Sequence, residues 1–220
     1  MYTLQWGVLL RYLDRLLWGV VLSLSITAAS LLAGAVIGLL LAFAQVYGNR
    51  LLRGIVKWYV EFFRNIPLLL IIVIIYFCLP LIGIRFLDNF ASVILAMSLY
   101  AGAYLTEVFR AGILSVEKVY LEAGKSIGLT GVGVARYVTL PLMFAQVLPA
   151  LSNTTISLFK DSSLASSVSV AEITLIGRII NTDTWRIVEA WTVVAGFYLG
   201  VSYLLAFLLR RVEQRLVRWR

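Results

Sequence analysis

The sequence predicts an all-α integral membrane protein with about five transmembrane helices. Of its 220 residues, 61% are hydrophobic and only 14% are charged. Soluble domains carry more charge, about a quarter of their residues. A helix needs about 20 apolar residues to cross a hydrocarbon core of about 30 Å. Five long runs with little or no charge come near that length, and together with a mean hydropathy of +0.95 they indicate this class.

The predicted spans begin with one run that is longer than a single crossing requires. Its helix is therefore expected over about 20–46. Residues 1–19 before it form an N-terminal segment that mixes Leu and Trp with charges, as helices lying at a membrane interface do. The five uncharged or nearly uncharged runs are 16–49, 65–84, 89–106, 137–159 and 190–209.

The distribution of Lys and Arg predicts the orientation. Thirteen of the 19 cationic residues fall in 50–64, 110–136 and 210–220, after the first, third and fifth spans. Cytoplasmic loops of membrane proteins are enriched in Lys and Arg. We therefore expect an external N-terminus, a cytoplasmic C-terminus and a cytoplasmic loop at 114–141.

Composition excludes several kinds of chemistry. The chain has no His and one Cys, so it has no imidazole base, no Cys/His metal site and no internal disulfide. Cys78 lies in an apolar run and is expected to be a small buried hydrophobe. The net charge of +8 reflects topology rather than a nucleic-acid partner, because the cationic residues gather beside the spans.

The loop at 114–141 is expected to contain a short amphipathic helix over 116–127, ended by Gly128. It presents either a docking element for a cytoplasmic partner or a solvated loop helix without one. Its sequence Gly124-Lys125-Ser126 is similar to the end of a nucleotide-binding loop, but Val119 stands where that motif requires Gly. Nucleotide binding is not expected. The apolar residues at helical spacing are Val116, Val119, Tyr120, Ala123 and Ile127.

The same loop carries a longer pattern. The segment resembles the EAA loop of permease subunits of ATP-binding-cassette (ABC) importers, in which E-A-A and a later G precede I-x-L-P. Val138 replaces the Ile and Gly124 the second Ala. The resemblance implies a single permease domain over 1–220 with the metI-like fold of type I importers. The matching residues are Glu122, Ala123, Gly128, Leu140 and Pro141.

In that family the short helix sits in a groove of the ATPase subunit and transmits closure of its nucleotide site. The resemblance makes Glu122 the charged contact and Gly128 the sharp bend. Ala123, Gly124 and Pro141 belong to the same coupling loop. The chain itself would bind no cofactor, since ATP and Mg²⁺ belong to the partner ATPase, and it would be no enzyme.

Ionisable residues within a span are functional candidates because they are costly in hydrocarbon. Lys160 and Asp161 stand out, followed by Ser162 and Ser163. If the helix enters near Pro149, Lys160 lies about 16 Å inside, near the midplane. Lys160 either lines a solute path and meets a carboxylate, or takes part in an internal ion pair or hydrogen bond that fixes helix packing.

Two pairs of opposite charge mark other helix ends. Glu61 and Arg64 are three residues apart, as are Glu107 and Arg110, and this spacing puts each pair on one helix face. They either pair with themselves or serve in gating or subunit contact. Close helix approach is also expected at Gly34-x-x-x-Gly38 and Gly196-x-x-x-Gly200.

The segment at 160–164 and the two charged motifs resemble polar amino acid permeases, as do Pro149 and Asn153. The resemblance adds Arg64 and Asn153 to the candidates for the substrate path. The block 63–68 is similar to glutamate- and glutamine-type permeases, which suggests an acidic or amide amino acid. The family operates in the bacterial inner membrane as a multi-pass subunit.

The resemblance also implies the partners: two ABC ATPase subunits, a second permease subunit that is identical or homologous, and an extracytoplasmic solute-binding protein. Three alternatives remain open from the residues alone. The chain is an ABC permease for another small polar solute, a secondary transporter or channel, or a purely structural membrane subunit.

Overall fold

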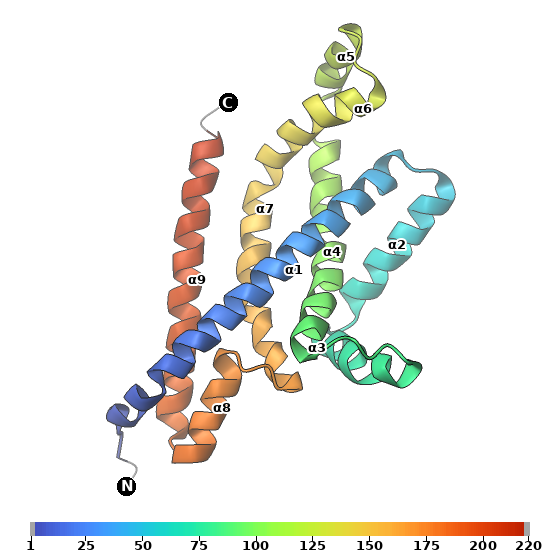
Figure 1. The fold of residues 1–220 in the computed structure, drawn as a ribbon. Helices are drawn as coiled ribbons and strands as arrows, with labels where there is room; N and C mark the ends of the chain where they lie inside the picture. The colour runs from blue at the N-terminus through green and yellow to red at the C-terminus, as the bar shows by residue number, and fades with distance from the viewer. Residues whose placement is uncertain (1–2, 218–220) are drawn as a thin grey trace. The chain divides into compact units, whose positions relative to one another are not determined.

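The computed structural model describes residues 3–217, and helices account for nearly all of them (Figure 1). No strand occurs in this range. Short 3-10 or π segments, labelled η, continue several helices. In chain order the elements are η1 (Trp6–Tyr12), α1 (Leu13–Tyr47), α2 (Arg50–Asn65), α3 (Leu68–Val73), η2 (Ile74–Cys78), η3 (Leu79–Ile82), α4 (Asn89–Leu114), α5 (Lys118–Ser126), α6 (Gly131–Val134), η4 (Ala135–Thr139), α7 (Leu140–Asp161), η5 (Ser162–Val168), α8 (Ile173–Thr184) and α9 (Ile187–Val217).

The helices confirm the predicted fold class. Within the described residues, four helical stretches are long and apolar enough to cross a membrane, at 6–47, 89–114, 131–168 and 187–215. A fifth crossing is available if α2 and the following α3–η3 segment count as one span, bent by 103°. The chain is therefore all-helical with four to five candidate spans.

Helix α2 is not among the predicted spans. Glu61 and Arg64 were expected at a helix end, and residues 50–65 form a 16-residue helix that contains both. Its charges fall between apolar residues, so a search for uncharged runs passes over it. Helical spacing places Val56 and Val60 on a buried side while charged side chains remain exposed. Asn49 caps its first turn by accepting from the backbone N–H of Leu52 at 2.8 Å.

Two further expectations differ from the structure. Helix α1 begins at Leu13, so much of the N-terminal segment is continuous with the first span. Cys78 is exposed in this chain, not buried. Pro149 lies inside α7, which begins at Leu140, because a membrane helix tolerates the loss of the hydrogen bond that proline removes.

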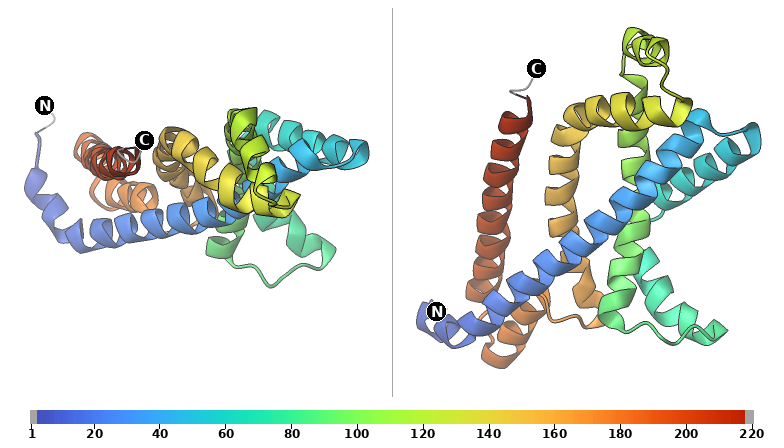
Figure 2. Two further views of the ribbon diagram at one scale, coloured as in Figure 1. Left: turned by 90° about the horizontal axis from the view of Figure 1, so that it is seen from above. Right: turned by 45° about the horizontal axis from the view of Figure 1, so that its top comes forward.

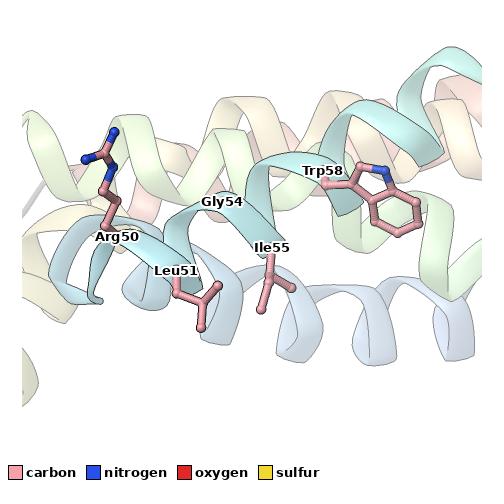
Figure 3. Close-up of a pocket in the computed structure, with 5 residues that line it drawn as sticks. All are labelled: Arg50, Leu51, Gly54, Ile55 and Trp58. Carbon is pink, nitrogen blue, oxygen red and sulfur yellow. The ribbon is translucent and has the colours of Figure 1, made fainter.

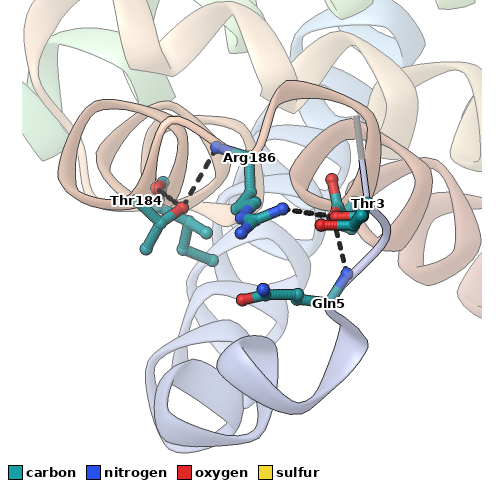
Figure 4. Close-up of polar contacts among 6 residues, drawn as sticks. Thr3, Gln5, Thr184 and Arg186 are labelled. Atoms are coloured by element: carbon teal, nitrogen blue, oxygen red, sulfur yellow. Dashed lines mark hydrogen bonds and ion pairs between the residues drawn. The ribbon is translucent and has the colours of Figure 1, made fainter. Parts of the chain in front are cut away.

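The first of two compact units comprises residues 3–31, 67–98 and 155–207 of the described chain. Its apolar core joins η1, α1, the end of α7, α8 and α9, with Leu16, Phe159 and Ile173 fully buried. Two hydrogen bonds hold the segment before η1 against the junction of α8 and α9. The Gln5 N–H donates to a Glu189 carboxylate oxygen at 2.9 Å, and the Arg186 guanidinium donates to the Thr3 carbonyl at 2.5 Å (Figure 4).

The second unit comprises residues 32–66, 99–154 and 208–217 of the described chain. Glycines let its helices approach closely. An added Cβ at Gly38 of α1 would lie 2.8 Å from the Leu105 Cβ and 3.0 Å from the Leu105 carbonyl carbon of α4. The Tyr59 hydroxyl of α2 donates to the Leu99 carbonyl at 2.7 Å. Gly38 thus has the packing role that its spacing predicts, whereas Gly196 and Gly200 meet nothing within 4 Å in the described chain.

Gly38→Ala should destabilise the protein by about 1–3 kcal/mol, the usual cost of overpacking, because its new methyl group meets helix backbone. Gly196→Ala is the matched control, since the added methyl finds open space. Thermal unfolding of both purified variants in detergent measures the difference. Equal melting temperatures for Gly38→Ala and wild type would contradict the close contact between α1 and α4.

Candidate functional site: an exposed loop helix, a polar helix face and a charged pocket

Helix α5 confirms the short helix predicted in the loop. It spans Lys118–Ser126 and ends where Gly128 adopts a φ of +87°. The Gly128 N–H donates to the Lys125 carbonyl at 2.9 Å, and the Leu129 N–H to the Gly124 carbonyl at 3.1 Å. These bonds satisfy carbonyls that the helix end leaves without partners. Figures 1 and 2 show α5 set apart from the long helices, beyond the C-terminal end of α4.

The side of α5 that faces the protein is formed around Gly124. Gly124 is buried, and a Cβ there would lie 3.2 Å from Val138 and 3.4 Å from Val134. This glycine therefore seats α5 on the segment that leads into α7. A cavity of about 560 Å³ adjoins the same contact and is lined by Phe43, Tyr47, Leu121, Lys125, Gly131, Val132, Val134 and Ala135.

An adjoining side of α5 is apolar and uncovered. Val119 is 62% exposed and Ile127 80% exposed, with Tyr120 and Ala123 exposed on the turns between them. Of the apolar residues predicted to share a face, only Val116 is buried. Glu122 is also exposed. A short helix that turns an apolar stripe and a carboxylate outward has the form of a docking element.

Helix α7 carries an exposed polar face. Its exposed residues follow one another at intervals of three or four, which places them on one side of the helix. They are Gln146, Pro149, Asn153, Ser157 and Lys160. Met143, Val147, Leu158 and Phe159 are buried. Side chains of such polarity are costly against lipid. This face is therefore suited to a protein partner or to a water-filled path.

The polar residues at the end of α7 have different environments. The Lys160 amine has no carboxylate within 4.0 Å among the described residues, so the internal ion pair considered from sequence is not formed by this chain. Asp161 and Ser163 are partly buried. Ser162 is fully buried and its hydroxyl donates to the Phe159 carbonyl at 2.7 Å, which leaves it facing the protein interior.

The two predicted helix-end pairs meet in one pocket. Glu107 and Arg110 of α4 form the expected pair, with 2.7 Å between Nη2 and Oε2. Glu61 of α2 instead lies 3.7 Å from the Lys57 amine, and the Arg64 guanidinium lies over the Tyr104 ring, 5.2 Å from its centroid. The cavity measures about 280 Å³ and is lined by Gln45, Lys57, Val60, Glu61, Arg64, Glu107 and Arg110.

Helix α2 also presents an apolar side. Leu51, Ile55 and Trp58 are 74%, 56% and 64% exposed, and they line a shallow hollow with Arg50 and Gly54. Figure 3 shows the side chains of Leu51 and Ile55 directed to the same side of the helix. In contrast with the α7 face, this surface is suited to lipid or to an apolar partner.

Two buried carboxylates escaped the sequence reasoning. Glu172 is fully buried and caps α8 by accepting from the N–H groups of Thr174 and Leu175 at 2.9 and 3.0 Å, while the Tyr198 hydroxyl donates to it at 2.6 Å. Burial raises the pKa of Glu172, and these hydrogen bonds oppose the rise. The available signal was an acidic residue directly ahead of an apolar helical run. Both Glu172 and the equally buried Glu189 have structural partners.

The known proteins that this chain is similar to are membrane components of transport systems. Residues 34–218 match the family described as binding-protein-dependent transport system inner membrane component. The glutamine transport system permease protein GlnP of Escherichia coli (strain K12) is 35% identical over 214 residues, which cover 96% of this chain and 97% of GlnP. The L-cystine transport system permease protein TcyB of Bacillus subtilis (strain 168) is 37% identical over 204 residues, 91% of this chain and 86% of TcyB.

Solved structures show the same fold. A crystal structure of an amino acid ABC transporter with histidines matches with a TM-score of 0.88 and 28% identity, covering 97% of this chain and all of the other. The MetNI methionine ABC transporter in an inward-facing conformation matches with a TM-score of 0.79 at 22% identity. The second likeness bears on the fold alone, which is the MetI-like permease fold.

Gly128→Ala should loosen the end of α5, because a residue other than glycine in the left-handed region costs about 1–2 kcal/mol. Gly131→Ala is the control, since that glycine has open space and an ordinary φ. Hydrogen exchange of residues 118–134 should speed up about tenfold in Gly128→Ala and stay near the wild-type rate in the control. Unchanged exchange in both variants would show that the bend does not depend on glycine.

Proposed function

Because the chain belongs to the family of inner membrane components of binding-protein-dependent transport systems, we propose that it imports polar amino acids as the permease subunit of an ATP-driven ABC importer. Members of this family are multi-pass inner membrane subunits and not enzymes, and ATP hydrolysis is done by a separate subunit. The observation that carries the proposal is α5, whose exposed apolar stripe and Glu122 are ready to dock.

In the proposed mechanism, α5 sits in a groove of the ATPase. Val119, Tyr120 and Ile127 supply the apolar contact and Glu122 the charged one. Gly124 and Gly128 hold the helix at its angle to the chain that follows, so that a push on α5 is passed through Val134 and Val138 to α7. Pro141 is exposed in the first turn of α7, the end of that helix to which the push on α5 would be passed.

The proposed substrate path runs along α7. Lys160 and Asn153 share its exposed polar face, about 11 Å apart along the helix axis, and Lys160 would meet the carboxylate that all amino acids carry. Asp161 and Ser163 are partly buried beside it, whereas Ser162 would act by bracing the helix. A second permease subunit, identical or homologous, would complete the path by facing the same surface.

Transport would follow alternating access. An extracytoplasmic binding protein delivers the amino acid, closure of two ATPases opens the path outward, and hydrolysis resets it. This requires α5 to lie in the cytoplasm, as the Lys and Arg distribution predicts. Glutamine and cystine are the substrates in the names of two relatives, and the α-amino acid backbone is what these solutes share. An amide or acidic side chain remains the preferred substrate class.

The class of solute is tested by uptake into proteoliposomes that contain the assembled complex and its binding protein. A panel of labelled amino acids should give ATP-dependent uptake of at least one polar member, with glutamine, glutamate and aspartate examined first. Uptake of another small polar solute, with none of the amino acids, would overturn the substrate class.

Glu122→Lys should leave the protein inserted and folded but reduce substrate-stimulated ATP hydrolysis to the basal rate, because a carboxylate at the ATPase groove becomes a cation. Glu117→Lys is the control. It makes the same charge change at the residue that precedes α5, outside the matched EAA pattern. ATP hydrolysis in proteoliposomes is the measurement. Normal stimulation in Glu122→Lys would sink the docking assignment.

Lys160→Met should abolish uptake or redirect it to another solute while the complex still assembles, since the side chain keeps its length but loses the charge that would meet a carboxylate. Lys160→Arg retains the charge and should retain part of the uptake. Labelled uptake and co-purification with the ATPase are measured together. Wild-type transport in Lys160→Met would assign Lys160 to packing instead.

A further inference from the structure

The charged pocket between α1, α2 and α4 is lined by no residue of α7. Its cavity of about 280 Å³ lies within the second unit and receives side chains from all three helices. Arg110 is four residues from the end of α4, from which the chain passes into α5. The pocket is therefore near the end of α4 that carries the loop helix.

The charges in this pocket do not balance. Three cations and two carboxylates line it. Lys57 is paired with Glu61, and Arg110 with Glu107. The Arg64 guanidinium lies against the Tyr104 ring and has no carboxylate within 4.0 Å among the described residues. A guanidinium without a carboxylate partner can bind one by donating two parallel hydrogen bonds to its oxygens.

A second group in the pocket lacks a partner. The side-chain oxygen of Gln45 is buried and accepts no hydrogen bond within the described part of the chain. A buried acceptor without a donor is unfavourable unless a ligand or water supplies one. The pocket thus offers an acceptor from α1 together with a cation from α2, and the carboxylates of Glu61 and Glu107 stand beside them.

We propose that this pocket binds the backbone of a free α-amino acid, with the carboxylate on Arg64 and the ammonium on the Gln45 oxygen beside Glu61 and Glu107. A zwitterion supplies both a carboxylate for Arg64 and a donor for the Gln45 oxygen. The inference rests on the proposed function, under which this side is cytoplasmic. The site would then hold an imported amino acid on the release side, distinct from the path at Lys160.

The test is equilibrium binding of labelled L-glutamine to the assembled complex in lipid nanodiscs, without binding protein or nucleotide. Because the site reads only the backbone, the wild-type complex must bind L-glutamine whichever amino acid it imports. Arg64→Gln should weaken binding about tenfold or more, the loss of a charge-assisted hydrogen bond. Gln45→Leu should weaken it severalfold, and Arg64→Lys less than Arg64→Gln.

Lys57→Gln is the matched control, since it removes a cation from the same pocket whose charge is already paired with Glu61. Its affinity should stay within about twofold of wild type, as expected for an exposed ion pair. Propionate and L-glutamine methyl ester, each lacking one half of the zwitterion, should compete at least about tenfold less well than L-glutamine.

Lys160→Met distinguishes the two sites when it is combined with Arg64→Gln: in the Lys160→Met background, Arg64→Gln should still weaken the remaining L-glutamine binding about tenfold or more. Binding that is lost in Lys160→Met and unaffected by Arg64→Gln overturns the inference, as does the absence of L-glutamine binding to wild type. Propionate competing as well as L-glutamine would reveal a simple anion site. The uptake panel decides the proposed function separately, so a complex that imports amino acids without binding that depends on Arg64 overturns the inference alone.

Discussion

The structure depends on one constraint: polar groups on a membrane-spanning helix need protein or water beside them, because hydrocarbon offers neither hydrogen bonds nor solvation. Most of the long helices satisfy it by exposing apolar residues, as α9 does with Leu199, Tyr203 and Leu204. Helix α7 does not, since Asn153, Ser157 and Lys160 lie exposed along one side. This side of α7 therefore needs protein or water beside it.

A second constraint concerns how closely the helices approach one another. Small residues at contact points allow this close approach. Gly38 brings α1 onto the backbone of α4, and Gly124 brings α5 onto the Val134 and Val138 side chains of the segment before α7. The apolar residues of α5 lie away from this contact, and Val119 and Ile127 remain exposed.

The sequence predicted the helical class, four of its five spans as single long helices, and the short loop helix with its end at Gly128. Each of these rests on local properties: run length, periodicity and a glycine that accepts positive φ. It placed Glu61 and Arg64 at a helix end but did not predict the full length of α2. In α2 charges alternate with apolar residues, and only a partner helix shows which side is buried.

The candidate site divides in the same way. Residue type and spacing alone determined that the loop at 114–141 resembles a coupling loop, and that Lys160 and the pairs at 61–64 and 107–110 merit attention. Only tertiary structure decided that Ser162 and Gly124 turn inward, that Glu61 pairs with Lys57, and that Arg64 and Gln45 meet in one pocket. Local sequence encodes the conformation of each helix, whereas the neighbours of a side chain come from helices distant in the chain.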